Sequence, residues 1–163
     1  MGLSWQQGPL ASGAADPYHR IDIRQTSRHL VVRHGGRLVA DTRRPLVLYE
    51  SGFAPPWYVP RADADETALT PAKGQTFCPY KGLASYYDIA GADGTAAARR
   101  AAWSYQDAYA EVGRISGLIS FEPDRAEVLI DGTRLRLEPG QNVVPHGLDR
   151  DLTLDEAAGG PSR

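Results

Sequence analysis

The amino-acid sequence predicts a mainly β domain with a few short helices. Short runs rich in β-branched and aromatic residues recur along the central part of the 163-residue chain. Glycine-containing dipeptides of the kind that close tight turns separate several of these runs. Segments with helical periodicity are few and short. Hairpins between neighbouring strands are therefore expected.

The first hairpin is expected around Gly35-Gly36, between strands over residues 30–33 and 38–41. Glycine readily takes the positive φ that two-residue hairpin turns need. A third strand follows over residues 45–50, and a strand tolerates proline at its first position, here Pro45.

The later strands are expected over residues 57–59, which prolines flank, then over 85–89 and 102–105. Residues 127–137 form a closing hairpin across Asp131-Gly132, a strong turn dipeptide.

Helical signal is limited to short segments. One or two turns are expected within residues 63–69, and another short helix within residues 108–116 before Gly117. Residues 94–102 are rich in alanine and have helix propensity, but they lie where a hairpin connection is expected. Both interpretations of this segment stay open.

The length suits a single domain with tails. Residues 1–20 are expected to form an N-terminal arm, 21–138 the folded domain, and 139–163 a C-terminal tail. Either tail could recruit a partner, which gives a third functional hypothesis, that of an interaction protein.

Composition excludes several classes of protein. A net charge of -2 argues against a dedicated nucleic-acid binder. The single cysteine permits neither an internal disulfide nor a thiolate zinc site, and the four histidines have no metal-ligand spacing. No apolar run is long enough to span a membrane, and the N-terminus lacks signal-peptide features. A cytoplasmic protein without membrane or nucleic-acid partners is expected, of open oligomeric state.

Three separated motifs occur in a recognisable order. They are the segment 48–61, which contains Glu50 and ends in Pro-Arg, the Cys-Pro-Tyr-Lys-Gly segment within 76–87, and Trp-Ser-Tyr within 102–105. This pattern resembles the bacterial and fungal family catalogued as domain of unknown function 427, from about residue 28 to 132. The chain departs from the family pattern at Gln106 and Ala64, both away from the expected site.

The resemblance implies a β-tent-like arrangement of two small antiparallel sheets, similar to the ligand-binding domain of cereblon and to methionine sulfoxide reductase B. Many β-tents hold zinc through two Cys-x-x-Cys pairs, which this chain lacks, so a zinc-free version is implied. A label of the family mentions nucleotidyl transfer, but the chain has no phosphate-cradling Gly-Lys-Ser/Thr loop and no obvious metal-binding acidic pair. No cofactor is expected.

Glu50 and Lys81 are the leading candidates for catalysis. Strand alternation places Glu50 on the same face as Leu46 and Leu48, so its carboxylate needs a partner or a cavity. Lys81 or Arg61 could be that partner. A pair of Glu50 with Lys81 is either an acid–base couple or a structural ion pair.

Cys78 and Arg61 each have two interpretations. Cys78 is a third catalytic candidate, because a cation such as Lys81 lowers a thiol pKa, but free cysteines are also among the most buried residues. A redox role is weaker, since no second thiol exists. Arg61 either binds an anionic substrate group or pairs with Asp63 or Asp65.

Aromatic residues complete the expected site and are assigned to substrate binding together with Arg61, although core packing is the commoner role of any single ring. They are Tyr58, Tyr80, Tyr86, Trp103 and Tyr105. The leading hypothesis is a small-molecule enzyme that uses acid–base chemistry, of open reaction class. The alternative is a module that binds a small molecule or a modified peptide without changing it.

Overall fold

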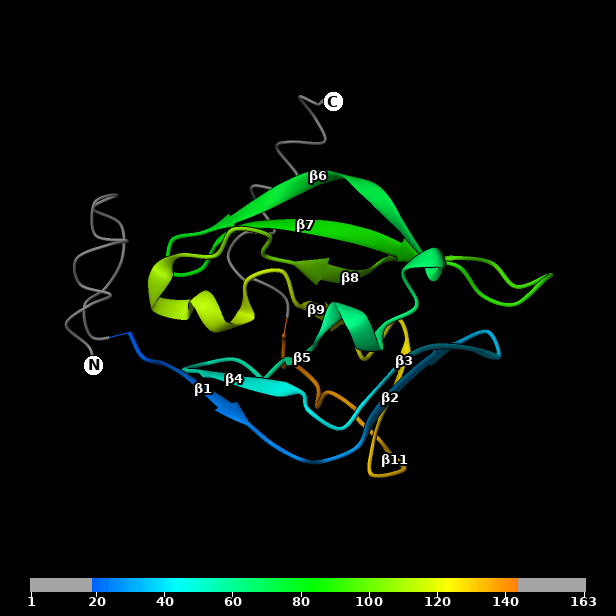
Figure 1. Cartoon of the computed structure of the whole chain (residues 1–163), viewed down its shortest axis with the longest axis horizontal. Helices are drawn as coiled ribbons and strands as arrows, with labels where there is room; N and C mark the ends of the chain where they lie inside the picture. The colour runs from blue at the N-terminus through cyan, green and yellow to red at the C-terminus, as the bar shows by residue number, and fades with distance from the viewer. Residues whose placement is uncertain (1–18, 144–163) are drawn as a thin grey trace.

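The computed structural model describes residues 19–143, and in this part of the chain two antiparallel sheets hold all the named strands. The larger sheet has the order β1–β4–β5–β9–β8–β7–β6, and the smaller one has the order β11–β10–β2–β3 (Figure 1). The larger sheet consists of β1 (Ile21–Gln25), β4 (Leu46–Glu50), β5 (Trp57–Val59), β6 (Leu69–Cys78), β7 (Gly82–Ile89), β8 (Ala98–Ser104) and β9 (Ile119–Phe121). The smaller sheet consists of β2 (Leu30–His34), β3 (Arg37–Thr42), β10 (Glu127–Ile130) and β11 (Thr133–Arg134). The predicted mainly β class with two antiparallel sheets is confirmed.

Both predicted hairpin turns are present in the smaller sheet. Gly35 and Gly36 have φ of 55° and 79°, and they connect β2 to β3. Asp131 and Gly132 have φ of 50° and 85°, and they connect β10 to β11. The positive φ at all four positions is the conformation that a two-residue hairpin turn requires.

The prediction missed three strands, β1, β6 and β9. The edge strand β6 pairs only with β7, and it contains Pro71 and Gly74 beside an irregularity in the pairing. An edge strand tolerates such residues, so it lacks the alternating pattern of a buried strand. The helical interpretation of residues 94–102 is wrong, because β8 begins at Ala98 and is held between β7 and β9. Tertiary pairing overrides the alanine propensity there.

The short helices are 3₁₀ turns, namely η2 (Arg61–Asp63), η3 (Glu66–Ala68) and η4 (Ala110–Ile115). The turns η3 and η4 lie within the segments expected to be helical, whereas η2 precedes the expected segment and overlaps it only at Asp63. Asp65 precedes η3, and its side chain accepts a hydrogen bond from the backbone N–H of Thr67. This bond satisfies a donor that the first turn leaves without a partner.

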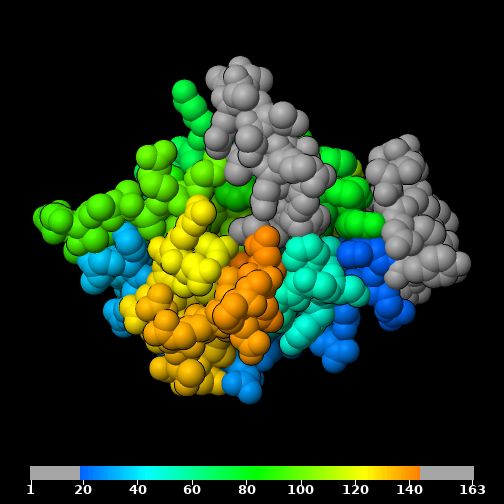
Figure 2. All heavy atoms as spheres, turned by 180° about the vertical axis from the view of Figure 1, so that it is seen from behind, coloured from blue at the N-terminus to red at the C-terminus, as the bar shows by residue number. Residues whose placement is uncertain are grey.

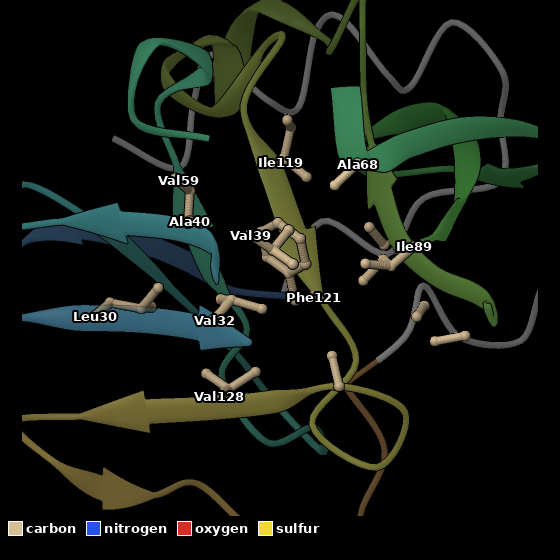
Figure 3. Packing of buried hydrophobic residues seen from close by; sticks show 14 residues of the cluster. Leu30, Val32, Val39, Ala40, Val59, Ala68, Ile89, Ile119, Phe121 and Val128 are labelled. Atoms are coloured by element: carbon tan, nitrogen blue, oxygen red, sulfur yellow. The ribbon is translucent and has the colours of Figure 1, made fainter. Parts of the chain in front are cut away.

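The first hydrophobic core lies between the two sheets. Leu30, Val32 and Val39 of the smaller sheet are buried in one cluster with Ile119 and Phe121 of the larger sheet (Figure 3). The segment between η2 and η3 is also bonded to the smaller sheet, since the N–H of Asp65 donates to the carbonyl of Val39 in β3 at 2.7 Å. This core buries one face of the larger sheet and leaves its other face for a second core.

The second core fills the opposite face of the larger sheet. It contains Leu48 from β4, Tyr58 from β5, Tyr86 from β7 and Trp103 from β8, and η4 covers it with Val112. The segment after β11 also reaches this core: Val143 is buried in it, and the carbonyl of Asn142 accepts from the N–H of Ala54. From behind, this orange segment runs beside the region after β4, drawn in cyan (Figure 2).

The larger sheet curls around this second core. In a flat sheet β4 and β7 would lie roughly 19 Å apart, because three strands separate them at about 4.8 Å per step. Side chains at the ends of these two strands nevertheless touch, as the site below shows. Figure 1 shows β1 and β4 on one side of the molecule and β6 and β7 on the other, facing each other.

None of the helical segments within residues 19–143 has the length and hydropathy needed to cross a bilayer. Residues 1–18 and 144–163 lie outside the described residues, and they include most of the predicted arm and tail. Residues 139–143 begin the predicted tail, and they pack on the domain through Val143.

Candidate functional site

The candidate site begins at the end of β4. Leu48 and Glu50 are buried, whereas Tyr49 between them is exposed. The predicted alternation is therefore present, and it directs Glu50 to the side of the sheet that carries the second core. A carboxylate on this face requires a partner, because an unpaired buried charge is strongly unfavourable.

Lys81 comes from the tight turn between β6 and β7. The backbone N–H of Lys81 donates to the carbonyl of Cys78 at 3.2 Å, which closes the turn. Gly82 follows with φ of 113°, a conformation that side-chain-bearing residues rarely adopt. The chain has only two lysines, and Lys81 is buried whereas Lys73 is exposed. A buried lysine is therefore distinctive in this protein, because nearly all its other positively charged side chains are arginines.

Glu50 and Lys81 form a buried ion pair. Lys81 Nζ lies 2.5 Å from Glu50 Oε1, and each side chain is only 4% exposed. Burial raises the pKa of the Glu50 carboxyl, but the Lys81 charge and the hydrogen bonds from Lys81 and His19 outweigh burial. The pKa therefore lies below its ordinary value, and Glu50 is ionised at neutral pH.

His19 is a third member of the site that the sequence did not reveal. Its Nε2 lies 2.7 Å from Glu50 Oε2, so the two carboxylate oxygens have different partners. The imidazole stacks on the ring of Tyr80, with centroids 3.9 Å apart and planes inclined by 20°. His19 precedes β1, which pairs with β4, and this long-range pairing brings it to Glu50. A scattered histidine without nearby motif residues gives no local signal for such a contact.

A group of hydroxyl-bearing side chains extends the site into the second core. Trp103 Nε1 donates to the Tyr58 hydroxyl at 3.3 Å, and the hydroxyls of Thr76 and Tyr86 are 2.9 Å apart. The buried Tyr105 hydroxyl has no hydrogen-bond partner among the described residues, and its ring centroid lies 6.0 Å from Lys81 Nζ. Burial raises the pKa of Tyr58 and of Tyr105, so both hydroxyls stay protonated.

The structure places the five predicted aromatics together. Tyr58, Tyr86, Trp103 and Tyr105 are buried in the second core, and Tyr80 packs against this core at the turn that carries Lys81. They line the same region as the Glu50–Lys81 pair. Strand alternation accounts for Tyr58 of β5, Tyr86 of β7 and Trp103 of β8, whereas Tyr80 lies in the turn before β7 and Tyr105 directly follows β8.

Cys78 lies in the same core, and its side chain is completely buried. Burial raises the pKa of the thiol, and the charge of Lys81 offsets this effect only in part. The neutral thiol therefore predominates at neutral pH, and it forms part of the packed wall beside the site.

Arg61 makes its contacts elsewhere. Its guanidinium donates to the carbonyl of Gly117 at 2.7 Å, to Glu66 at 2.7 Å and to the Tyr87 hydroxyl at 3.2 Å. Tyr87 packs against the first core. Neither Asp63 nor Asp65, the expected partners, is bound by Arg61: in the described structure they pair with Arg44 and Arg37.

Residues 19–143 contain no group of three or more histidine, cysteine, aspartate and glutamate side chains placed to hold a metal ion. The candidate site therefore consists of the Glu50–Lys81 ion pair, the His19 imidazole and a set of neutral hydroxyl groups.

Comparison with curated proteins gives no match. A family model does match, over residues 22–132, which is more than half of the chain. The match contains the three motifs of the sequence analysis and starts within β1, six residues before the resemblance noted there. The chain therefore belongs to the family described as a domain of unknown function (DUF427).

Proposed function

We propose that this protein is a small-molecule enzyme in which Glu50 and Lys81 act as an acid–base couple. The observation that carries the proposal is the buried ion pair at 2.5 Å. The ring centroid of Tyr105 lies 6.0 Å from Lys81 Nζ, and its buried hydroxyl has no hydrogen-bond partner among the described residues. Buried polar groups normally have partners, so a tyrosine with an unpaired hydroxyl in the same core as a charged pair supports a site that takes a polar substrate.

The proposed chemistry is proton transfer. The ionised Glu50 takes a proton from an acidic X–H bond of the substrate, and the electron pair stays on the substrate. The Lys81 ammonium stabilises that developing negative charge. Such electrostatic stabilisation is strongest in a site that excludes water. The Tyr105 hydroxyl donates a hydrogen bond to the substrate. Glu50 then returns the proton to the substrate or releases it.

Two residues expected in the mechanism are left out of it. Arg61 has its guanidinium occupied by Gly117, Glu66 and Tyr87, so Lys81 takes over the binding of anionic groups. Cys78 is buried with a raised thiol pKa, so it shapes the site and makes no covalent bond to the substrate.

The second candidate is a binding module of the same site. It is favoured by the lowered pKa of Glu50, because a general base works best with a pKa near the working pH. In that case the charged pair and the hydroxyls recognise a small molecule or a modified peptide and leave it unchanged.

The cellular location and the partners of the protein are inferred from the sequence. We infer a cytoplasmic protein without a nucleic-acid partner, supported by the single cysteine of the chain and the net charge of -2. We also infer that the two sheets form a β-tent.

Turnover assays on the full chain test the proposal. The protein is incubated with a bacterial metabolite extract, and mass spectrometry identifies compounds that disappear and their products. Glu50→Gln and Lys81→Met are then compared with Lys73→Met, which replaces the exposed lysine and serves as the matched control.

The proposal predicts that Glu50→Gln and Lys81→Met each lower kcat by about 10²-fold or more, while Lys73→Met keeps wild-type turnover. Full turnover by a folded Glu50→Gln protein excludes the mechanism. A compound that binds and is recovered unchanged supports the binding module instead.

A further inference from the structure

We propose that His19 is the proton relay that connects the buried Glu50–Lys81 pair with solvent. This inference rests on the proposed function in the case where Glu50 releases the substrate proton, because that proton must then pass to water between turnovers. Glu50 and Lys81 are each 4% exposed, so direct exchange is hindered. The His19 side chain is 16% exposed and touches Glu50, which makes it the most open of the three.

The two carboxylate oxygens of Glu50 contact different partners. Oε1 accepts from Lys81 Nζ at 2.5 Å, whereas Oε2 contacts His19 Nε2 at 2.7 Å. One oxygen therefore faces the buried ammonium and the other faces the route to solvent. A proton that leaves Lys81 or a substrate is first accepted by the Glu50 carboxylate. His19 is the next group along the path from Glu50 to solvent.

The orientation of the imidazole suits this role. An ionised carboxylate only accepts hydrogen bonds, so Nε2 carries the proton in the contact with Oε2. Stacking on Tyr80 at 3.9 Å holds the ring plane and keeps Nε2 directed at Glu50. Histidine suits a relay because it binds and releases protons near neutral pH and has two ring nitrogens.

The proton balance is simple. In the inward direction water gives a proton to Nδ1, and the Nε2 proton passes to Oε2 of Glu50. The imidazole stays neutral overall and ends with its proton on Nδ1. In the outward direction Oε2 returns a proton to Nε2, and Nδ1 releases one to water. No other reactant is needed in either direction.

The relay works among few titratable groups of the described structure. Glu50 contacts His19 from the end of β4, and Tyr80 contacts it from the turn between β6 and β7. Lys81 lies behind Glu50 on the same turn as Tyr80. A second carboxylate is absent from these contacts, so Glu50 is the acceptor that His19 serves.

Exchange of the Lys81 ammonium protons with water tests the relay without any substrate. In ¹⁵N-labelled protein the side-chain ammonium spectrum contains at most two signals, because the chain has two lysines. The exposed Lys73 exchanges rapidly, so the buried Lys81 gives the persistent signal. Its exchange rate is measured in wild type, His19→Gln, His19→Phe and His29→Gln.

The relay predicts that His19→Gln slows exchange at Lys81 by about 10²-fold, because glutamine keeps a hydrogen-bond donor but cannot pass a proton on. His19→Phe keeps a ring on Tyr80, and it slows exchange as well, so one folded variant is sufficient. His29→Gln is the matched control, since His29 contacts Asp41 at 2.6 Å away from the site, and it leaves the rate unchanged.

An unchanged rate in His19→Gln overturns the relay. A faster rate also overturns it, because His19 then only covers the pair. The exchange measurement is independent of turnover. If exchange contradicts the relay while turnover still requires Glu50, only the relay is refuted and the proposed enzyme mechanism stands. Confirmation of the relay together with full turnover by Glu50→Gln removes only the proposed enzyme mechanism.

Discussion

Lys81 Nζ and Glu50 Oε1 are 2.5 Å apart although β5, β9 and β8 lie between β4, which ends at Glu50, and β7, which begins directly after Lys81. The contact is possible because the larger sheet curls and brings β4 opposite the β6–β7 turn. The aromatic core fills the space inside this curve. The ion pair therefore joins the two arms of one sheet, and it has consequences for stability as well as for chemistry.

Removal of one member of the pair is expected to destabilise the fold. Glu50→Gln and Lys81→Met should each lower the free energy of unfolding by about 3–5 kcal/mol, because the remaining group stays buried without its partner. The measurement is urea denaturation. Lys73→Met should change it by less than about 0.5 kcal/mol, as an exposed position. Equal effects of Lys81→Met and Lys73→Met would contradict the structure.

Stability should fall at acidic pH through Glu50. Its pKa is lower in the folded than in the unfolded chain, so the ionised carboxylate stabilises the fold above its ordinary pKa of 4.5. This contribution is lost as pH falls through the lower, folded pKa. The difference in unfolding free energy between wild type and Glu50→Gln should shrink between about pH 7 and pH 2. A difference that stays constant or grows on acidification would count against the ion pair.

Cys78 should be inert in the folded protein. The thiol is fully buried and its pKa is raised, and both features suppress the reactive thiolate. A thiol reagent such as Ellman's should react slowly with the native chain at neutral pH and consume one equivalent in denaturant. Rapid reaction of the native protein would restore Cys78 as a candidate nucleophile.

Arg61 should matter for stability and not for turnover. Arg61→Ala removes three hydrogen-bonding contacts and leaves the carbonyl of the half-buried Gly117 without this donor, which should cost about 1–3 kcal/mol. Arg44→Ala is the matched control: the Arg44 side chain is 59% exposed against 29% for Arg61, so its loss should cost less than the loss of Arg61. Chemical denaturation gives both values. A stable Arg61→Ala protein that has lost turnover would instead support the predicted role of Arg61 in substrate binding.

Local sequence features predict much of the fold because they act over short distances. Gly35-Gly36 and Asp131-Gly132 determine the two hairpins of the smaller sheet, and alternation along β4 correctly buries Glu50. The same alternation groups Tyr58, Tyr86 and Trp103. These features need only the geometry of a strand and a turn, which neighbouring residues decide.

The remaining features depend on contacts between distant segments. His19 meets Glu50 only because β1 pairs with β4, and no residue near His19 indicates that pairing. Arg61 follows the Pro-rich segment, yet it is held by Gly117 and Tyr87 from much later in the chain. β8 is alanine-rich and becomes a strand because β7 and β9 flank it. Each outcome is decided by tertiary structure, so sequence patterns alone could not give it.

The most direct test of the acid–base couple separates its chemistry from its contribution to stability. Replacement of a buried ion pair by apolar residues of similar volume is often neutral or stabilising, so Glu50→Leu with Lys81→Met should keep the fold. Turnover of the substrate identified from the extract is measured with this double variant and with wild type. We predict a folded double variant of wild-type stability or better, with turnover lowered by about 10²-fold or more. Wild-type turnover by the folded double variant would contradict the account.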